Sequence, residues 1–207
     1  MKMNKNNTEE NIIQAAEYEF IERGFEGARM QAIADKAGIN KALLHYYFRS
    51  KQKLFEVIFK NAFKLFIPRI LNVFERQDLD FFEKIEAFVE NYLNILAKHP
   101  HIPGFIIHEL ANNPSSIAKI VQEIAPDISP IKSQIEAEIT KGTILNIRPE
   151  HIILNVLAMS IFPIVASPIA TMILFNGDKK QYATLLAERK NHVSDFIIRS
   201  IKNPNFK

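Results

Sequence analysis

The sequence predicts an all-α protein, and three observations support this fold class. Apolar residues recur at helical spacing in successive segments, as in Ile131, Ile135 and Ile139. Glycines, prolines and N-capping residues separate these segments, and no segment reads convincingly as a strand. With 47% hydrophobic and 24% charged residues over 207 positions, the composition is globular and supplies ample material for a core. The length allows one domain or two small ones.

The first predicted helix begins near the N-terminus of the chain. Thr8 is a plausible N-cap, and apolar residues from Ile12 to Phe20 share one helical face. Gly24 is expected to end this helix, because glycine adopts the conformations that terminate a helix at little steric cost.

Residues 31–51 predict two short helices joined by a tight turn. Gly38 can adopt positive φ at the end of the first helix, and the side chain of Asn40 can cap the second. In the second helix Leu44 and Phe48 are four apart and point inward. The residues left on its outer surface are Lys41, Ala42, His45 and Tyr46. A helix–turn–helix places its second helix in the DNA major groove, so this pattern predicts DNA binding.

The distribution of charge favours the same function. Between Lys36 and Lys60 six basic residues face one acid, Glu56, which gives a local charge of +5 in a chain whose net charge is +3. A basic patch on a near-neutral body is typical of a DNA-binding protein. A solvated lysine-rich face explains the charge about equally well, and the helix–turn–helix decides between the two.

A fourth helix is predicted to begin at Lys51, with Ser50 as its cap. It carries phenylalanines at spacings of four, four and three: Phe55, Phe59, Phe63 and Phe66. Pro68 should kink or end this helix, because proline lacks a backbone donor and clashes with the preceding turn.

The later helices follow from caps and breaks. Asp80 with Glu83 resembles a capping box, Gly142 stops a helix, and Pro149 suits a first turn. The remaining predicted helices cover about residues 80–98, 105–112, 116–124, 128–140, 149–162 and 181–202.

The uncharged run from Ile152 to Phe175 is long enough to cross a bilayer. Its polar residues, and its two prolines Pro163 and Pro168, favour a buried or subunit-interface helix instead. The N-terminus lacks the apolar core of a signal peptide, and the chain has no cysteine for a disulfide or a thiolate metal site. We therefore expect a cytoplasmic protein with no membrane partner.

The segment from Ile12 to Ile58 resembles the DNA-binding domain of the tetracycline-repressor (TetR) family. Three elements carry the resemblance in order and spacing: ERGF at Glu22–Phe25, IA–KAGI at Ile33–Ile39, and K–L–YYF–SK–L at Lys41–Leu54. The resemblance implies that residues 1–49 form a three-helix helix–turn–helix DNA-binding domain. It also implies that residues 50–207 form a larger helical ligand-binding and dimerisation bundle, in which the fourth helix transmits motion from a ligand pocket.

The resemblance, carried over by position, assigns the residues that would face DNA. They are Arg29, Gln31, Asn40, Lys41, Ala42, Leu43, His45, Tyr46, Tyr47 and Lys51. Lys41 and Lys51 would contact phosphates, and Gln31 and His45 are the candidate base readers. Two departures from the family pattern bear on base preference: Arg29-Met30 replaces a small hydroxyl residue, and His45 replaces the usual tyrosine.

A mainly apolar ligand pocket is expected from residues of the predicted bundle. Aromatic candidates and a few orienting polar groups make up the set Phe63, Phe66, Phe88, Phe105, Asn94, His108 and Asn155. Each of these residues, taken singly, fits a position in the core or on the surface better than a ligand contact.

Two other classes of protein were weighed. A metalloenzyme or hydrolase is disfavoured, because His108-Glu109 does not continue as H-E-x-x-H and His99 and His101 flank Pro100 in a break. No catalytic residue, metal or cofactor is therefore expected. A helical protein-interaction module remains the alternative, and it leaves the outward residues of the predicted recognition helix unexplained.

The function predicted from the sequence is a sequence-specific DNA-binding transcriptional regulator, a repressor released by a small hydrophobic ligand. The uncharged run and the apolar face of the last helix predict an isologous four-helix interface in a homodimer. Two recognition helices would then read a palindromic operator.

Overall fold

The computed structural model describes the backbone of residues 5–206 and the side chains of residues 7–65 and 71–206. Within that range the fold is helical, and the only bridge pairs Ile144 with Lys202. The all-α prediction is thus confirmed. The chain divides into two compact units.

The first unit contains the described residues up to Lys64 together with Gly104–Ala125. Its helices are α1 (Lys5–Gly27), α2 (Met30–Lys36), α3 (Lys41–Tyr47), the first part of α4 (Lys51–Glu75), most of α6 (His101–Asn112) and α7 (Pro114–Ile124). This unit is larger than the domain expected over residues 1–49, because α4 and α6 contribute to the same core.

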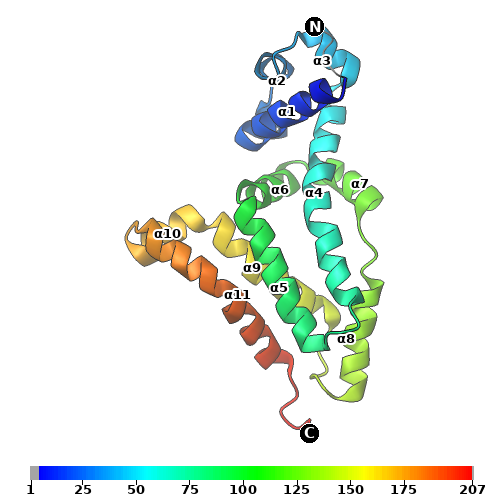
Figure 1. The fold of residues 1–207 in the computed structure, drawn as a ribbon, viewed down its shortest axis with the longest axis vertical. Helices are drawn as coiled ribbons and strands as arrows, with labels where there is room; N and C mark the ends of the chain where they lie inside the picture. The colour runs from blue at the N-terminus through cyan, green and yellow to red at the C-terminus, as the bar shows by residue number, and fades with distance from the viewer. Residues whose placement is uncertain (1–4, 207) are drawn as a thin grey trace. The chain divides into compact units, whose positions relative to one another are not determined.

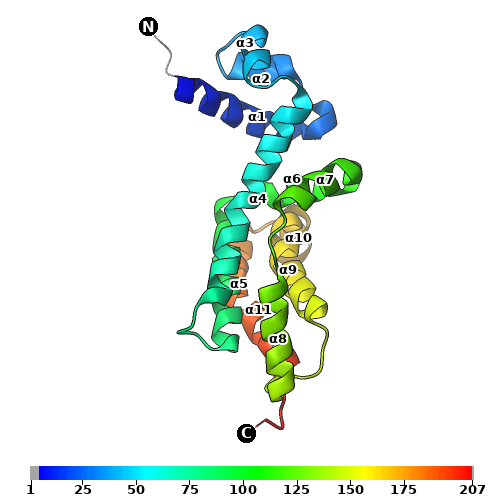
Figure 2. The same ribbon diagram turned by 90° about the vertical axis from the view of Figure 1, so that its right-hand side faces the viewer.

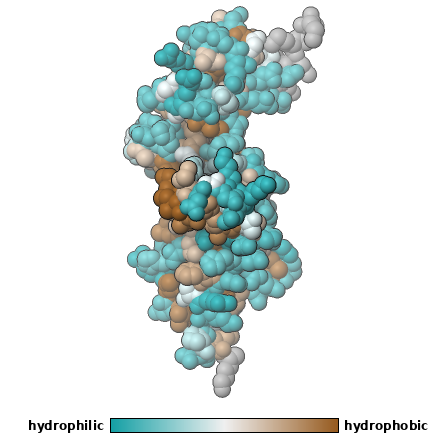
Figure 3. All heavy atoms as spheres, turned by 90° about the vertical axis from the view of Figure 1, so that its left-hand side faces the viewer, coloured by the Kyte–Doolittle hydropathy of each residue, from teal (hydrophilic) through white to brown (hydrophobic). Residues whose placement is uncertain are grey.

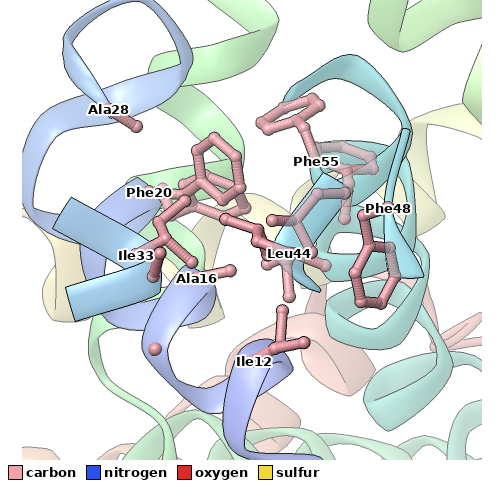
Figure 4. Packing of buried hydrophobic residues seen from close by; sticks show 14 of the residues in the cluster. Ile12, Ala16, Phe20, Ala28, Ile33, Leu44, Phe48 and Phe55 are labelled. Atoms are coloured by element: carbon pink, nitrogen blue, oxygen red, sulfur yellow. The ribbon is translucent and has the colours of Figure 1, made fainter. Parts of the chain in front are cut away.

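One hydrophobic core holds this unit together (Figure 4). The close-up shows side chains from α1, α2 and α3 converging, among them Phe20, Ile33 and Leu44, which are fully buried. Phe55 of α4 packs edge-on against Phe20 with ring centroids 5.3 Å apart. Burying each such side chain contributes roughly 1.5–3 kcal/mol to folding. The inward positions of Leu44 and Phe48 predicted from spacing are confirmed.

Local chemistry sets the turn between α2 and α3. Gly38 adopts φ of 68°, a left-handed conformation that favours glycine. The amide of Leu43 donates to Asn40 Oδ1 at 2.8 Å, and the amide of Lys53 donates to Ser50 Oγ at 3.2 Å. Both predicted N-caps are therefore confirmed.

Helix α1 differs from the prediction at its start. Thr8 lies inside the helix and is buried, so its assignment as an N-cap is wrong. A cap contributes only about 1 kcal/mol and does not stop a helix where the preceding residues continue it. The break expected at Gly24 is confirmed by its non-helical φ of 64°.

The second unit contains Leu65–Pro103 and Pro126–Lys207. Besides the end of α4, its helices are α5 (Phe81–Lys98), α8 (Ser129–Lys141), α9 (Pro149–Val165), α10 (Ser167–Phe175) and α11 (Lys179–Ile201). Helices α5, α9 and α11 lie side by side, and α8 packs against α9 (Figures 1 and 2). The predicted capping box is present, since Glu83 N–H donates to Asp80 Oδ1 and Asp80 N–H donates to Glu83 Oε2.

Prolines explain most of the differences in helix bounds. Helix α4 continues past Pro68 to Glu75, and α6 begins at His101 rather than near Phe105. Pro103 is tolerated there because the amides of a first turn have no partner inside the helix. The uncharged run from 152 to 175 forms two helices, which break at Ala166.

No single described helix is long and apolar enough to span a membrane. Only when α9 and α10 are taken together are their length and composition sufficient for a membrane span. The two helices are bent by 76° at the break between them.

Candidate nucleic-acid interface

Helix α3 presents a polar and aromatic face to solvent. Lys41, Ala42, His45 and Tyr46 are all exposed, as the sequence predicted, and Tyr46 retains 69% of its accessible surface. Tyr47 is half-buried, and its ring meets that of Tyr46 edge-on with centroids 5.6 Å apart. Two phenol rings are therefore held in a fixed mutual geometry at the end of this face.

Three cations around α3 are available to an external anion. Arg29, Lys41 and Arg49 are exposed, and none of them pairs with an acidic residue in the described part of the chain. Lys53, by contrast, forms an ion pair with Glu56 at 3.0 Å. Unpaired guanidinium and ammonium groups beside an exposed helix are the groups that contact DNA phosphates.

The two candidate base readers have local partners. Gln31 Nε2 donates to Asp35 Oδ1 at 2.8 Å, one helical turn along α2. His45 Nδ1 lies 3.4 Å from the carbonyl oxygen of Arg49. Both side chains are exposed, and each partner orients one edge of the side chain while the other edge faces solvent.

Two residues of the predicted DNA-facing set, Asn40 and Leu43, take part in the N-cap of α3. The side chain of Asn40 is used to cap α3, and Leu43 supplies the capped amide while its own side chain is half-buried. These residues shape the turn that positions α3.

Lys51 is bound within the protein. Its ammonium donates to the carbonyl oxygens of Glu26 and Ala28 at 3.1 and 3.0 Å, and it lies 4.7 Å from the centre of the Phe25 ring. Carbonyls at a helix C-terminus lack intrahelical donors, so Lys51 satisfies two of them and ties the start of α4 to the end of α1.

The departure at Arg29-Met30 has a structural explanation. Met30 is half-buried and packs against the core of the first unit, where an apolar side chain is favoured over a hydroxyl group. Arg29 is exposed at the N-terminus of α2, and its amide donates to Glu19 Oε1 at 3.3 Å.

Sequence reasoning missed a buried carboxylate in α6. Glu109 is fully buried, and it accepts the amide of Phe25 and the side-chain amide of Asn113, each at 2.8 Å. The carboxylate of Glu109 therefore links α6 to the backbone that follows the break at Gly24. Nothing local marks Glu109 in the sequence, because its partner lies 84 positions away.

The expected ligand-binding residues are divided between the two units. Phe63, Phe105 and His108 belong to the first unit, whereas Phe88, Asn94 and Asn155 belong to the second. Phe105 is buried against Phe55 and Phe59, and Asn94, His108 and Asn155 are exposed. The side chain of Phe66 lies outside the described residues.

Of that set, Phe88 lines an apolar cavity of about 160 Å³ in the second unit. The other walls come from residues that the sequence did not assign to a ligand pocket, on α4, α5, α8 and α9 and in the segment before α8. No group of three or more histidine, aspartate or glutamate side chains that could bind a metal ion occurs in the described part of the chain.

Comparison with known proteins identifies a family that the N-terminal part of this chain matches. Residues 12–58 match the family model described as "Bacterial regulatory proteins, tetR family". The transcriptional regulator RutR of Escherichia coli K12 is 26% identical over 148 residues, which cover 71% of this chain and 69% of RutR. The transcriptional repressor NicS of Pseudomonas putida is 37% identical over 59 residues, 28% of each chain.

A solved structure supports the fold over nearly the whole chain. HlyIIR, a hemolysin II transcriptional regulator, superimposes with a TM-score of 0.66 over 92% of this chain and 99% of its own, at 22% identity. The relatives named here are regulators of transcription and not enzymes.

Proposed function

Because this chain belongs to the tetR family of bacterial regulatory proteins, we propose that it is a sequence-specific, homodimeric transcriptional repressor that a small hydrophobic ligand releases from DNA. The observation that carries the proposal is the exposed face of α3 in a helix–turn–helix that also exposes Arg29 before α2 and Arg49 after α3. RutR is a transcriptional regulator and NicS is a transcriptional repressor, which supports the same class of activity for this chain.

Helix α3 would lie in the major groove with Lys41 toward the phosphate backbone. Tyr46 and Tyr47 would place their hydroxyl groups on phosphates and their rings against sugars or thymine methyl groups. Gln31 and His45 would read base edges, since glutamine can bond adenine in two places and histidine can donate to guanine.

Homodimerisation is supported by a large apolar surface on the second unit. Figure 3 shows hydrophobic residues gathered on the face that carries α10 and α11. The exposed apolar residues of α9, α10 and α11 are Leu154, Phe162, Val165, Ile169, Met172, Ile173, Leu174 and Phe196. A surface of this kind fits an isologous interface between two copies, which would place two α3 helices roughly 34–36 Å apart on a palindromic site.

Ligand release is supported by the course of α4 along the chain. This helix begins beside α3 and continues into the second unit, where Leu71 and Phe74 line the apolar cavity. A ligand that binds one pose of the protein about 10⁴-fold more tightly than the other converts a 1:99 equilibrium to 99:1. No ligand contact with DNA is needed for release.

A gel-shift experiment on a library of random duplexes at low salt tests DNA binding. The proposal expects a retarded complex, and sequencing of the retained duplexes should give a palindromic consensus. If no member of the library is retarded by the purified protein, the proposed function is wrong.

A further inference from the structure

The cavity of the second unit is built from four helices. Leu71 and Phe74 of α4, Ile85 and Phe88 of α5, Ile135 of α8 and Val156 of α9 contribute to its walls. Every residue that lines it is apolar, and the volume is about 160 Å³. The space lies wholly inside one compact unit.

Among the described residues of α4, α5, α8 and α9, the one buried charged side chain is already hydrogen-bonded to protein partners. Lys84 is buried on α5, and its ammonium donates to the carbonyl oxygen of Phe74 at 3.2 Å and to Gln134 Oε1 at 3.1 Å. Gln134 Nε2 donates to the same carbonyl at 2.9 Å. The ammonium of Lys84 is thus hydrogen-bonded to the last turn of α4. Lys84 lines a neighbouring hollow and does not line the cavity.

Charged side chains where α8 meets the start of α9 are paired with one another. Lys132 Nζ lies 2.8 Å from Glu150 Oε1, and Arg148 Nε lies 3.5 Å from Glu150 Oε2. A carboxylate, phosphate or ammonium group placed in the cavity would lose its hydration without gaining a partner, which is strongly unfavourable.

We propose that this cavity is the ligand site and that its ligand is an uncharged, apolar molecule of about one aromatic ring or a short alkyl chain. That this ligand regulates DNA binding rests on the proposed function. The inference narrows the ligand to molecules that carry no ionised group. An apolar cavity of about 150 Å³ stays dry and can hold a benzene molecule, so the size matches this class.

Thermal unfolding with benzene as the probe tests the site, and benzoate serves as its charged counterpart. Benzene should raise the midpoint of unfolding in proportion to the logarithm of its concentration once the site is saturated, because it binds only the folded state. Benzoate at equal concentrations should leave the midpoint unchanged.

Two variants locate the binding in this cavity. Val156→Phe should fill the space and abolish the benzene effect, whereas His151→Phe, which adds a similar ring at an exposed position on the same helix, should retain it. Circular dichroism establishes that each variant is folded. Should Val156→Phe not fold, Ile135→Ala provides the test: it enlarges the cavity, so propylbenzene should bind it at least several-fold more tightly than it binds the wild type.

The proposal is overturned if benzene leaves the wild-type midpoint unchanged, if benzoate acts as strongly as benzene, or if Val156→Phe folds and still responds. It is also overturned if propylbenzene binds Ile135→Ala no better than the wild type. These measurements use protein without DNA. A protein that binds benzene in the cavity but forms no complex with any duplex would leave the site standing and refute the proposed function instead.

Discussion

Lys51 and Lys41 both begin helices in the first unit, but their surroundings differ. The ammonium of Lys51 donates to two backbone carbonyls, whereas Lys41 is exposed without a described acidic partner. Lys51 should therefore contribute to the stability of the domain, whereas Lys41 should contribute to contact with DNA.

We predict that Lys51→Met lowers the free energy of unfolding by about 1 kcal/mol, because the carbonyls of Glu26 and Ala28, in one exposed and one partly buried hydrogen bond, lose a charged donor. Chemical denaturation of the purified protein measures this change. Lys41→Met is the matched control and should stay within about 0.5 kcal/mol of the wild type. Equal stabilities for the two variants would contradict the role of Lys51 as a tie between α1 and α4.

Gln31→Ala is predicted to relax the base preference at one position of the operator. The loss should be about 1–3 kcal/mol against the preferred base and little against others, because a base-reading side chain contributes only where its base is present. Competition gel shifts with single-base operator variants measure this. A uniform loss over all sequences would show that Gln31 acts on the backbone of DNA or of the protein.

Residues whose role is local were predictable, and residues whose partners are distant were not. Asn40 and Ser50 act on amides three positions away, so the sequence is enough to assign them. The carbonyls that Lys51 satisfies lie 23 and 25 positions away, and the amide that Glu109 accepts is farther still. Only the fold brings these groups together.

Helix α9 contains Pro163, and α11 compensates for it. Proline has no amide hydrogen, so the carbonyl of Met159, four residues earlier, lacks its usual donor. Arg189 Nη2 donates to that carbonyl at 2.8 Å, and the Tyr182 hydroxyl donates to the Pro163 carbonyl at 2.5 Å. Burial lowers the pKa of the Arg189 guanidinium and raises the pKa of the Tyr182 phenol, as expected for desolvated groups.

Arg189→Met is predicted to destabilise the protein by about 1–3 kcal/mol, because the carbonyl of Met159 is left without a donor. The same substitution should cost less in a Pro163→Ala background, where residue 163 regains an amide for that carbonyl. A double-mutant cycle measured by denaturation gives the coupling energy. Strictly additive effects would mean that Arg189 does not act on the proline.

Helices were predictable where caps and spacing agreed, and their bounds shifted where prolines intervened. Asp80 and Glu83 mark the start of α5 by their own side chains. Helix α4 continues past Pro68, and α6 includes Pro103 in its first turn, where a proline removes no hydrogen bond inside the helix. The cavity walls were missed because they depend on how four helices meet.

The whole molecule exposes an apolar surface that a lone chain would not be expected to keep. Phe162 on α9 and Ile173 on α10 each retain 70% of their accessible surface. Contiguous apolar surface of this kind favours association, and the proposed palindromic operator would be read by a two-fold symmetric dimer.

Phe162→Glu is therefore predicted to convert a dimer into a monomer at micromolar concentration, because a charge would be buried at the interface without a partner. Sedimentation measures the state of assembly. Leu145→Glu, an exposed position outside α9–α11, is the matched control and should remain dimeric. A wild-type protein that sediments as a stable monomer would refute the proposed interface.

The central claim is that α3 binds DNA through contacts that include phosphates. The most direct test is the salt dependence of affinity for the selected operator, measured for the wild type and for Lys41→Ala. Affinity should fall steeply and linearly on a log–log scale, and the slope for Lys41→Ala should be flatter by about 0.9, as expected for one lost phosphate contact. A slope that Lys41→Ala leaves unchanged, or an affinity that does not respond to salt, would contradict the account.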